Sequence, residues 1–274
     1  MRRVGRALLA IPAISFAILV YVWITLPDVR PLRERNPQTT AFIELRAREA
    51  RARGETPRRV QRWVSYNRIA DSLKRAVLVA EDALFWQHEG VDLEQMQKSF
   101  EINLAQGKIA RGGSTITQQL AKNLYLSPSR NPVRKLRELM IARRLEAELS
   151  KRRILELYLN VIEWGDGVYG AEAAARTYFR KAAAWLSPPE AALLAGAIIN
   201  PRTFSPARPN GRLRARQRLI LRRMRYFEPP PPAPGEPAPP AVPIEPLPVA
   251  PGEALPVEPP PLPPVKPIPE KPIP

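Results

Sequence analysis

A hydrogen-bonding edge that ends in a cation stands out in the stretch GGSTITQQLAKN, residues 112–123. Ser114, Gln118 and Lys122 recur every four residues, so a helix would place them on one side. A solvated helix would carry several Glu and Lys residues, whereas this stretch has one charge among hydroxyl and amide side chains. A partner must therefore be found for the polar side. A second stripe at the same spacing is apolar: Ile116, Leu120 and Leu124.

A carboxylate suited to acid or base chemistry lies in AEDALFWQHEG, residues 80–90. On a helix, Glu81 would be surrounded at three- and four-residue spacing by Val77, Leu78 and Phe85. Partial desolvation there would raise its pKa toward that of a general base or acid. The alternative is a carboxylate that reaches water at the helix edge, and the helix alone leaves both open. His88 is the only histidine, so we expect a local hydrogen-bonding role and no Ser/His/Asp arrangement.

Cations cluster just downstream. Arg134 and Glu138 are four residues apart and could form an ordinary surface pair worth a few tenths of a kcal/mol. Lys122 and Arg130 precede them, so positive charges converge from two predicted helices and their connection. Such convergence suits a polyphosphate leaving group whose charge must be neutralised as it develops. No phosphate loop of the type GxxxxGK[ST] occurs, so we expect no nucleotide cofactor.

Helices must position most of these groups. Apolar residues recur at three- and four-residue spacing in seven stretches, which predicts a mainly α fold for the central part of the chain. Residues 58–69 are the one extended candidate. The predicted helices cover residues 72–85, 115–126, 132–149, 151–162, 170–179, 188–199 and 211–227.

The two ends differ from this central part. Residues 7–26 carry no charge and would span about 30 Å as a helix, the thickness of a bilayer core. Three arginines precede them, which predicts an uncleaved single-pass anchor with a cytoplasmic N-terminus. A cleaved signal peptide is the alternative, but no pair of small residues marks a cleavage site. Residues 229–274 contain 22 prolines and are predicted to be a disordered tail. The expected domains are 1–35, 36–228 and 229–274.

The net charge limits the classes of molecule that the chain is expected to bind. The net charge is +17, and the tail, with five acids and two bases, carries about −3, so the remainder carries about +20. An anionic membrane surface, a nucleic acid or a phosphorylated substrate would fit, and the predicted anchor argues against nucleic acid. The absence of cysteine excludes disulfides and Cys-ligated metal sites.

Four motifs follow one another along the central part of the chain. The first is E-D-x-x-F-x-x-H-x-G, beginning at Glu81, and the second is G-x-S-T-I-T-Q-Q-x-x-K-N, beginning at Gly112. R-K-x-x-E begins at Arg134, and K-x-x-I-L-x-x-Y-L-N begins at Lys151. In this order they resemble the motifs of the peptidoglycan glycosyltransferases, found alone or as one domain of class A penicillin-binding proteins. The matching region covers residues 76–205 and no motif position departs from the pattern.

This resemblance implies a lysozyme-like, two-lobed, mainly α fold and an inverting glycosyltransferase. Its substrates would be lipid II and the growing glycan strand, with undecaprenyl diphosphate released. Glu81 would be the general base, and Glu138 would serve the diphosphate, in one version through a divalent cation, Mg²⁺ or Mn²⁺. Residues 95–111 would form a membrane-dipping jaw. The substrate-binding residues would be Ser114, Thr117, Gln118, Gln119, Lys122, Asn123, Arg130, Arg134, Lys135 and Lys151.

The same resemblance implies a location. The protein would sit in the bacterial inner membrane with its catalytic domain in the periplasm, in contact with membrane lipids and with other cell-wall synthesis or division proteins. We expect a monofunctional enzyme, because the S-x-x-K and K-T-G motifs of transpeptidases are absent. Two alternatives remain: a lytic, muramidase-like enzyme with one catalytic Glu, and a non-enzymatic envelope scaffold. The predicted cations disfavour the first, since a glycan polymer has no diphosphate.

The arginines of residues 211–227 allow two interpretations. This stretch alternates arginines with Leu213, Leu219, Ile220 and Met224. The helix could help to seat the domain on anionic lipid, or it could be a solvated last helix packed on the core.

Overall fold

The computed structural model describes residues 14, 16–92, 97, 101, 113–127 and 131–227. The chain separates into two units, Met1–Ala233 and Pro234–Pro274, and every described residue belongs to the first. Several predictions fall outside the described residues: Arg130, the tail, almost all of the jaw segment and the first half of the predicted anchor.

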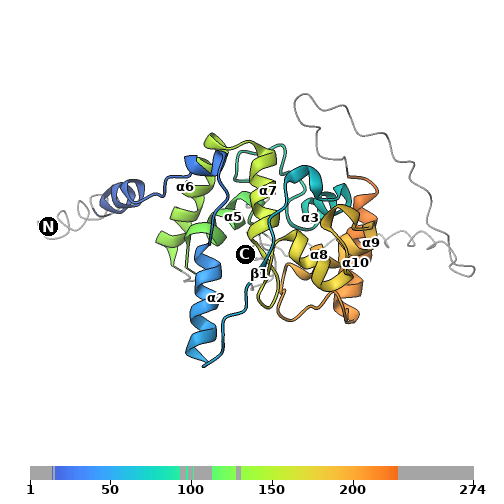
Figure 1. Cartoon of the computed structure of the whole chain (residues 1–274). Helices are drawn as coiled ribbons and strands as arrows, with labels where there is room; N and C mark the ends of the chain where they lie inside the picture. Colours follow the sequence, from blue (N-terminus) through green and yellow to red (C-terminus); the bar gives the residue numbers. More distant parts are fainter. Residues whose placement is uncertain are drawn as a thin grey trace, which may run out of the picture. The chain divides into compact units, whose positions relative to one another are not determined.

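The described part is mainly helical, as predicted, and Figure 1 shows how its helices are arranged. Seven helices match the seven predicted stretches, although α3 begins one residue before its stretch, and an eighth, α2 (Ala41–Ala52), was not predicted. Three short 3₁₀ segments link them at Arg30–Arg33, Tyr66–Arg68 and Ala183–Trp185. The seven are α3 (Asp71–Glu81), α5 (Ile116–Tyr125), α6 (Pro132–Glu148), α7 (Lys151–Val161), α8 (Ala171–Phe179), α9 (Pro188–Ala197) and α10 (Gly211–Met224).

Polar caps explain where several helices begin. The side chains of Thr115, Asn131, Ser150 and Asn210 each accept a hydrogen bond from a backbone N–H in the first turn of the helix that follows. Ser187 and Glu190 form a reciprocal capping box at α9. These caps fix the helix starts, which lie within a residue or two of the starts predicted from periodicity.

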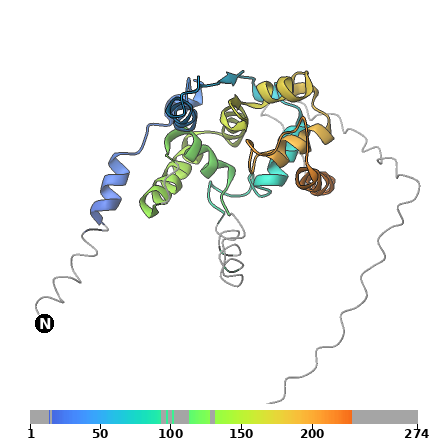
Figure 2. The ribbon, with the colours of Figure 1, turned by 90° about the horizontal axis from the view of Figure 1, so that it is seen from below.

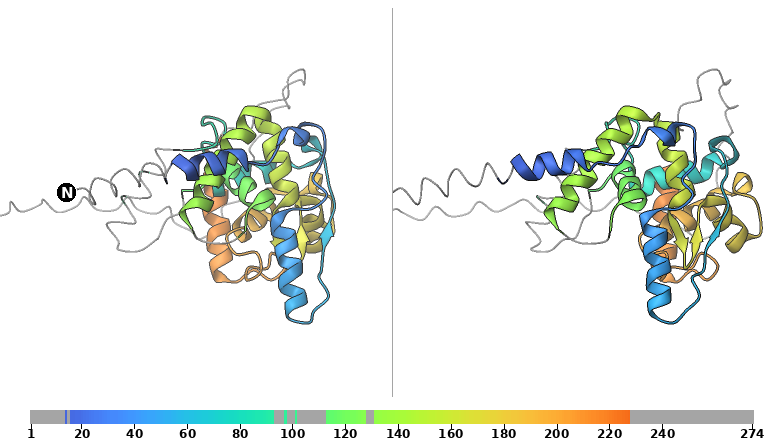
Figure 3. Two further views of the ribbon diagram at one scale, coloured as in Figure 1. Left: turned by 90° about the vertical axis from the view of Figure 1, so that its left-hand side faces the viewer. Right: turned by 60° about the vertical axis from the view of Figure 1, so that its left-hand side comes forward.

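A small sheet lies beside α2 (Figure 3). Its strands are β1 (Val60–Gln61), β2 (Glu163–Gly165) and β3 (Val168–Tyr169), in the order β1-β3-β2. The first is parallel to β3, with Val60 opposite Val168, and β2 is antiparallel to it. The predicted extended segment is thus confirmed only for two residues. An ion pair of 3.1 Å between Arg46 and Glu163 ties α2 to the sheet.

Two groups of helices meet at the candidate site. One group contains α3, α9 and α10, and the other contains α5 packed on α2, α6 and α7. Figures 1 and 2 show the groups side by side, with α2 and α10 on opposite sides of the unit. The core runs through both groups, and its largest fully buried side chains include Trp164, Tyr158 and Phe85. The C-terminal end of α3 is thereby placed against α5.

The N-terminal described segment exposes apolar surface. Residues 16–24 are helical, and Phe16, Trp23 and Ile24 are each about two-thirds or more exposed, at 68%, 67% and 74%. Among the described residues, no helix is long and apolar enough to cross a membrane.

Candidate active site

Glu81 occupies the last position of α3, where side chains from three helices meet. Its carboxylate accepts a hydrogen bond of 2.9 Å from Gln119 Nε2, on α5. The carbonyl oxygen of the same amide accepts a hydrogen bond of 2.9 Å from the hydroxyl of Tyr158, on α7. Because Tyr158 is fully buried, its hydroxyl fixes which end of the Gln119 amide faces the carboxylate. The arrangement aims an N–H donor at Glu81.

The surroundings of Glu81 favour a carboxyl group that binds a proton more readily than usual. Burial raises the pKa of Glu81, and the neighbouring Asp82 adds to the rise. The hydrogen bond from Gln119 and the charges of Arg216 and Lys122 oppose it, but the net pKa shift is upward. Burial also raises the pKa of Tyr158 well above its usual value, so its hydroxyl keeps the proton it donates. A carboxylate in this state suits general base catalysis.

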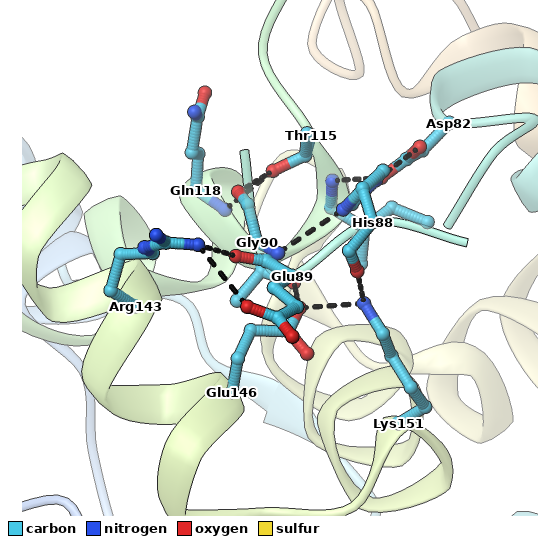
Figure 4. Close-up of polar contacts among 11 residues, drawn as sticks. Asp82, His88, Glu89, Gly90, Thr115, Gln118, Arg143, Glu146 and Lys151 are labelled. Atoms are coloured by element: carbon cyan, nitrogen blue, oxygen red, sulfur yellow. Dashed lines mark hydrogen bonds and ion pairs between the residues drawn. The ribbon is translucent and has the colours of Figure 1, made fainter. Parts of the chain in front are cut away.

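A buried network fixes the chain after Glu81 (Figure 4). The Asp82 carboxylate accepts hydrogen bonds from His88 Nε2 at 3.0 Å and from the backbone N–H of Ile116 at 2.9 Å. His88 Nδ1 accepts from the Gly90 N–H at 3.1 Å, and the Gly90 carbonyl accepts from the Thr115 hydroxyl at 2.7 Å. The end of α3 is therefore tied to the start of α5, which holds Glu81 and Gln119 in register. His88 has the local role expected from the sequence.

Lys151 stabilises this network and contacts protein groups on several sides. Its ammonium donates to Glu146 at 2.8 Å and to the His88 carbonyl at 2.5 Å, and it lies 4.5 Å from the centre of the Phe85 ring. The Thr117 hydroxyl donates to the same Glu146 oxygen at 2.5 Å. Because Glu146 already neutralises Lys151, this lysine is placed to hold α7 against the loop at 82–92. Its predicted contact with a diphosphate stays a prediction.

A second cluster surrounds Glu138, on α6. This buried carboxylate accepts from Arg134 at 2.7 Å and from Lys135 at 2.5 Å. The Lys135 ammonium also lies 3.4 Å from the Ser114 hydroxyl and 3.5 Å from the Gln118 carbonyl oxygen. The predicted polar edge of α5 thus faces the cations of α6. Glu138 holds both cations in place and leaves part of their charge for an anion.

Two groups on α5 remain available for a ligand. Among the residues that the structure describes, the buried Gln118 Nε2 has no hydrogen-bond partner, and Lys122 forms no ion pair. Figure 4 shows the Gln118 amide extending away from the Asp82–His88 network. Lys122 is exposed yet crowded, and partial desolvation together with the charges of Arg134 and Lys135 lowers its pKa. An anion would satisfy both groups at once.

Asn123 and Ser114 complete the placement of the predicted site residues. Asn123 is buried and its amide donates to the Gln119 carbonyl at 2.8 Å, within α5. Ser114 is exposed, just before α5 begins. The described residues therefore bring together Glu81 with Gln119, and Glu138 with Arg134, Lys135, Ser114 and Gln118.

Sequence reasoning missed the supports of this site. Tyr158, Glu146 and Arg216 were not among the predicted site residues, although Tyr158 lies in one of the motifs. Nothing in its apolar surroundings distinguishes a core tyrosine from a donor to Gln119, because α5 and α7 meet only in the folded chain.

The donor set does not fit a metal held by protein groups alone. Glu138 is bound by two cations, and no group of three or more His, Asp or Glu side chains that could hold a metal ion occurs in the described parts of the chain. These parts of the chain therefore offer a metal ion no complete set of protein ligands.

Comparison with known proteins identifies the family. The family model described as Transglycosylase matches residues 49–225, which include Glu81, Glu138 and the whole of α5. This chain belongs to the transglycosylase family. The matched region spans α3 and α5–α10, so the network around Glu81 and the cation cluster both lie inside the transglycosylase domain.

Curated relatives of this transglycosylase extend over most of its length. The biosynthetic peptidoglycan transglycosylase of Laribacter hongkongensis is 52% identical over 196 residues, which are 71% of this chain and 86% of that protein. The protein of the same name from Methylobacillus flagellatus is 49% identical over 218 residues, or 80% of this chain and 95% of that protein. The one from Aromatoleum aromaticum is 48% identical over 231 residues, 84% of this chain and 98% of that protein.

Proposed function

We propose that this transglycosylase is a peptidoglycan glycosyltransferase that polymerises lipid II into β-1,4 glycan, with Glu81 as the general base. The observation that carries the proposal is the pairing of a desolvated, hydrogen-bonded carboxylate with a cluster of cations on the next helices. Family membership and the names of the relatives support the reaction class. The residue roles and the leaving group are the finer part of the proposal.

The reaction would be one direct displacement. Glu81 takes the proton from the 4-hydroxyl of the acceptor sugar as that oxygen attacks the anomeric carbon of the growing chain. The bond between the anomeric carbon and the diphosphate oxygen breaks, and undecaprenyl diphosphate leaves with the bonding electrons. Because attack and departure occur on opposite faces, an α-linked diphosphate gives a β-linked glycan. A raised pKa helps Glu81 to accept the proton, and a positioned base is worth about 10²–10⁴ in rate.

The cations would serve the leaving group. Lys122, Arg134 and Lys135 carry charge on the side of α5 and α6 that Gln118 also faces. Their charge would stabilise the diphosphate as it departs, and Gln118 Nε2 would donate to one of its oxygens. Arg130, outside the described residues, is proposed to join them. A divalent ion, Mg²⁺ or Mn²⁺, would have to be held mainly by the diphosphate itself, and every step above proceeds through protein groups.

We also propose a location in the bacterial inner membrane. The catalytic domain would lie in the periplasm, following one membrane-spanning helix with a cytoplasmic N-terminus, and the lobes would have a lysozyme-like arrangement. The uncharged residues 7–26 and the exposed Phe16, Trp23 and Ile24 support this location, as does a lipid-linked substrate. Other cell-wall synthesis or division proteins are proposed as partners, and the Pro-rich tail is proposed to be disordered.

The test compares Glu81→Gln with Glu138→Gln on purified lipid II. Glu81→Gln should abolish polymerisation, because the amide keeps the volume and can still accept from Gln119 but takes no proton. Glu138→Gln should weaken donor binding as well as turnover, because Arg134 and Lys135 lose the carboxylate that positions them. A phosphoglycolipid donor mimic should stabilise Glu81→Gln against heat as it does the unmodified chain, and should stabilise Glu138→Gln less.

The melting temperature of Glu81→Gln shows whether a loss of activity reflects a loss of folding. Since the folded chain raises the pKa of Glu81, its ionised form costs folding free energy at neutral pH. This cost declines as the pH falls through the raised pKa, and it is gone below the ordinary pKa of the unfolded chain. Glu81→Gln should therefore melt at the same or a higher temperature than the unmodified chain at neutral pH. Polymerisation by folded Glu81→Gln would remove Glu81 from the mechanism. Release of fragments from a finished glycan, in place of polymerisation, would favour the lytic alternative.

A further inference from the structure

Helix α10 carries a charge pattern that the proposed reaction does not use. From Ala191 to Phe227 the chain contains nine arginines and no Asp or Glu. In Figure 1 this helix lies at the edge of the unit beside α9. Its arginines form no ion pair with a carboxylate among the described residues. Six of them, on α10 and the residue after it, are exposed: Arg212, Arg214, Arg218, Arg222, Arg223 and Arg225.

Apolar and basic residues are arranged in separate rows on the exposed face of α10. Leu213, Ile220 and Met224 are buried against the core and define the inner face of α10. On the outer face, Leu219 is 39% exposed and Tyr226, in the turn after the helix, is 89% exposed. With 3.6 residues per turn, Ala215 and Leu219 fall on one line, and Tyr226 follows in the turn after the helix. Arginines flank this line on both sides: Arg214, Arg218, Arg222 and Arg225 on one, and Arg212 and Arg223 on the other.

A solvated last helix accounts for only part of this pattern. Arg222 and Arg223 lie in the last turn, where positive charge stabilises the helix end. The first turns have no such reason to carry Arg212, Arg214 and Arg218, and no oppositely charged residues on α10 offset them. An apolar line between basic flanks, with an aromatic residue at one end, is typical of a helix that lies on a membrane surface.

We propose that the outer face of α10 binds an anionic lipid surface. The arginines would contact headgroup phosphates, and Leu219 and Tyr226 would enter the interfacial layer. Charge and pattern together favour a lipid surface, since a soluble anion would not need the apolar line. The proposal rests on the membrane location given under the proposed function. Each basic residue near an anionic surface strengthens binding by about fivefold.

A single-cysteine label tests the contact in the full chain, because the natural sequence has no cysteine. Ala215→Cys carries a fluorophore in the apolar line, and Ala52→Cys carries it at the exposed end of α2, on the opposite side of the unit (Figure 2). Each labelled protein is reconstituted into phosphatidylcholine vesicles that contain a headgroup spin label, with or without phosphatidylglycerol. Headgroup quenching should be several-fold stronger for Ala215→Cys with phosphatidylglycerol than without it, and should stay low for Ala52→Cys.

Charge variants identify the groups responsible. Replacing Arg214, Arg218, Arg222 and Arg225 together by Gln should abolish the quenching of Ala215→Cys, as should about 1 M salt, where screening reaches about 3 Å. The matched control replaces four exposed arginines elsewhere by Gln, which removes the same amount of charge: Arg48, Arg51, Arg62 and Arg68. The quenching of Ala215→Cys should persist in this control. Equal quenching in neutral and anionic vesicles, or equal loss in both charge variants, would overturn the proposal. Failure of the full chain to float with any vesicle would instead overturn the membrane location itself, and this proposal with it.

Discussion

The side-chain amide of Gln119 forms two hydrogen bonds at the candidate base. Its N–H donates to Glu81 and its carbonyl accepts from Tyr158, so the orientation of one amide links a buried hydroxyl to the reactive carboxylate. A hydrogen bond to the ionised form favours that form, and Gln119 accordingly lowers the pKa that burial raises. The proton affinity of Glu81 is thus a balance between desolvation and the donor that Tyr158 orients.

We therefore expect Tyr158→Phe to move the acidic limb of the pH–rate profile to higher pH. Without the hydroxyl, the Gln119 amide loses its orienting donor, its hydrogen bond to Glu81 weakens, and the pKa of Glu81 rises further. Since the base must be ionised to act, activity is then lost at a higher pH as the solution is acidified. The measurement is the polymerisation rate on lipid II across the acidic range.

Tyr178→Phe is the matched control. Its hydroxyl donates to the Trp164 carbonyl at 3.2 Å, away from Glu81, so this variant also loses one partly buried hydrogen bond. Leaving such an acceptor unpaired costs about 1–3 kcal/mol in either variant. Only Tyr158→Phe should shift the acidic limb. An unmoved limb, or one moved to lower pH, would show that Tyr158 does not orient the amide.

Helices could be predicted from the sequence where a local pattern of apolar residues determines them. The apolar periodicity of α5 and α6 placed two site helices from the sequence, and with them Glu138 and the polar edge of α5. Helix α2 was missed because charged residues interrupt its apolar positions. The strands have two or three residues each, too few to show alternation, and β1 pairs with a strand about a hundred residues away.

The contacts between elements could not be predicted. Glu146 and Lys151 meet only because α6 and α7 fold back on each other, and the Gln119–Tyr158 contact needs α5 against α7. Periodicity gives the face that a helix buries but not the partner that it buries against. The resemblance to a family supplied residues of the site, and the folded chain supplies the network that supports them.

The loop just after α3, residues 82–92, depends on a glycine. Gly90 has φ of +82°, and a Cβ there would lie 2.9 Å from Glu146 Cγ and 3.3 Å from the Ala142 carbonyl oxygen. We expect Gly90→Ala to lower the free energy of unfolding by more than about 1 kcal/mol and to reduce turnover. The displaced backbone of residue 90 carries the N–H that donates to His88 and the carbonyl that accepts from Thr115. Thermal denaturation and the polymerisation rate measure the two effects.

Gly54→Ala separates the backbone strain from the contacts. Gly54 also has a positive φ, +74°, but a Cβ there would meet nothing within 4 Å. Gly54→Ala should lower the free energy of unfolding by about 1 kcal/mol, through backbone strain alone, and leave turnover unchanged. If both variants lost the same stability and kept full activity, the close approach of Gly90 to α6 would have no role in the site.

At the scale of the whole molecule, charge and proline are distributed unequally. Residues 1–228 carry the positive excess, while residues 229–274 carry about −3 and 22 of the 34 prolines. The family match ends at residue 225. The last described side chain that packs against the core is Phe227, next to the buried Met224. The family match and the described core therefore both end before the Pro-rich segment begins.

A chain that ends after Glu228 should accordingly polymerise detergent-solubilised lipid II at an unchanged rate and melt at an unchanged temperature. It keeps Met224 and Phe227, and proline-rich sequence contributes little apolar area to a core. A chain that ends after Arg223 is the matched comparison, and it should be less stable by about 2–5 kcal/mol because it loses the buried Met224 side chain together with Phe227. A loss of more than about tenfold in rate on cutting after Glu228, at equal melting temperature, would assign the tail a part in turnover.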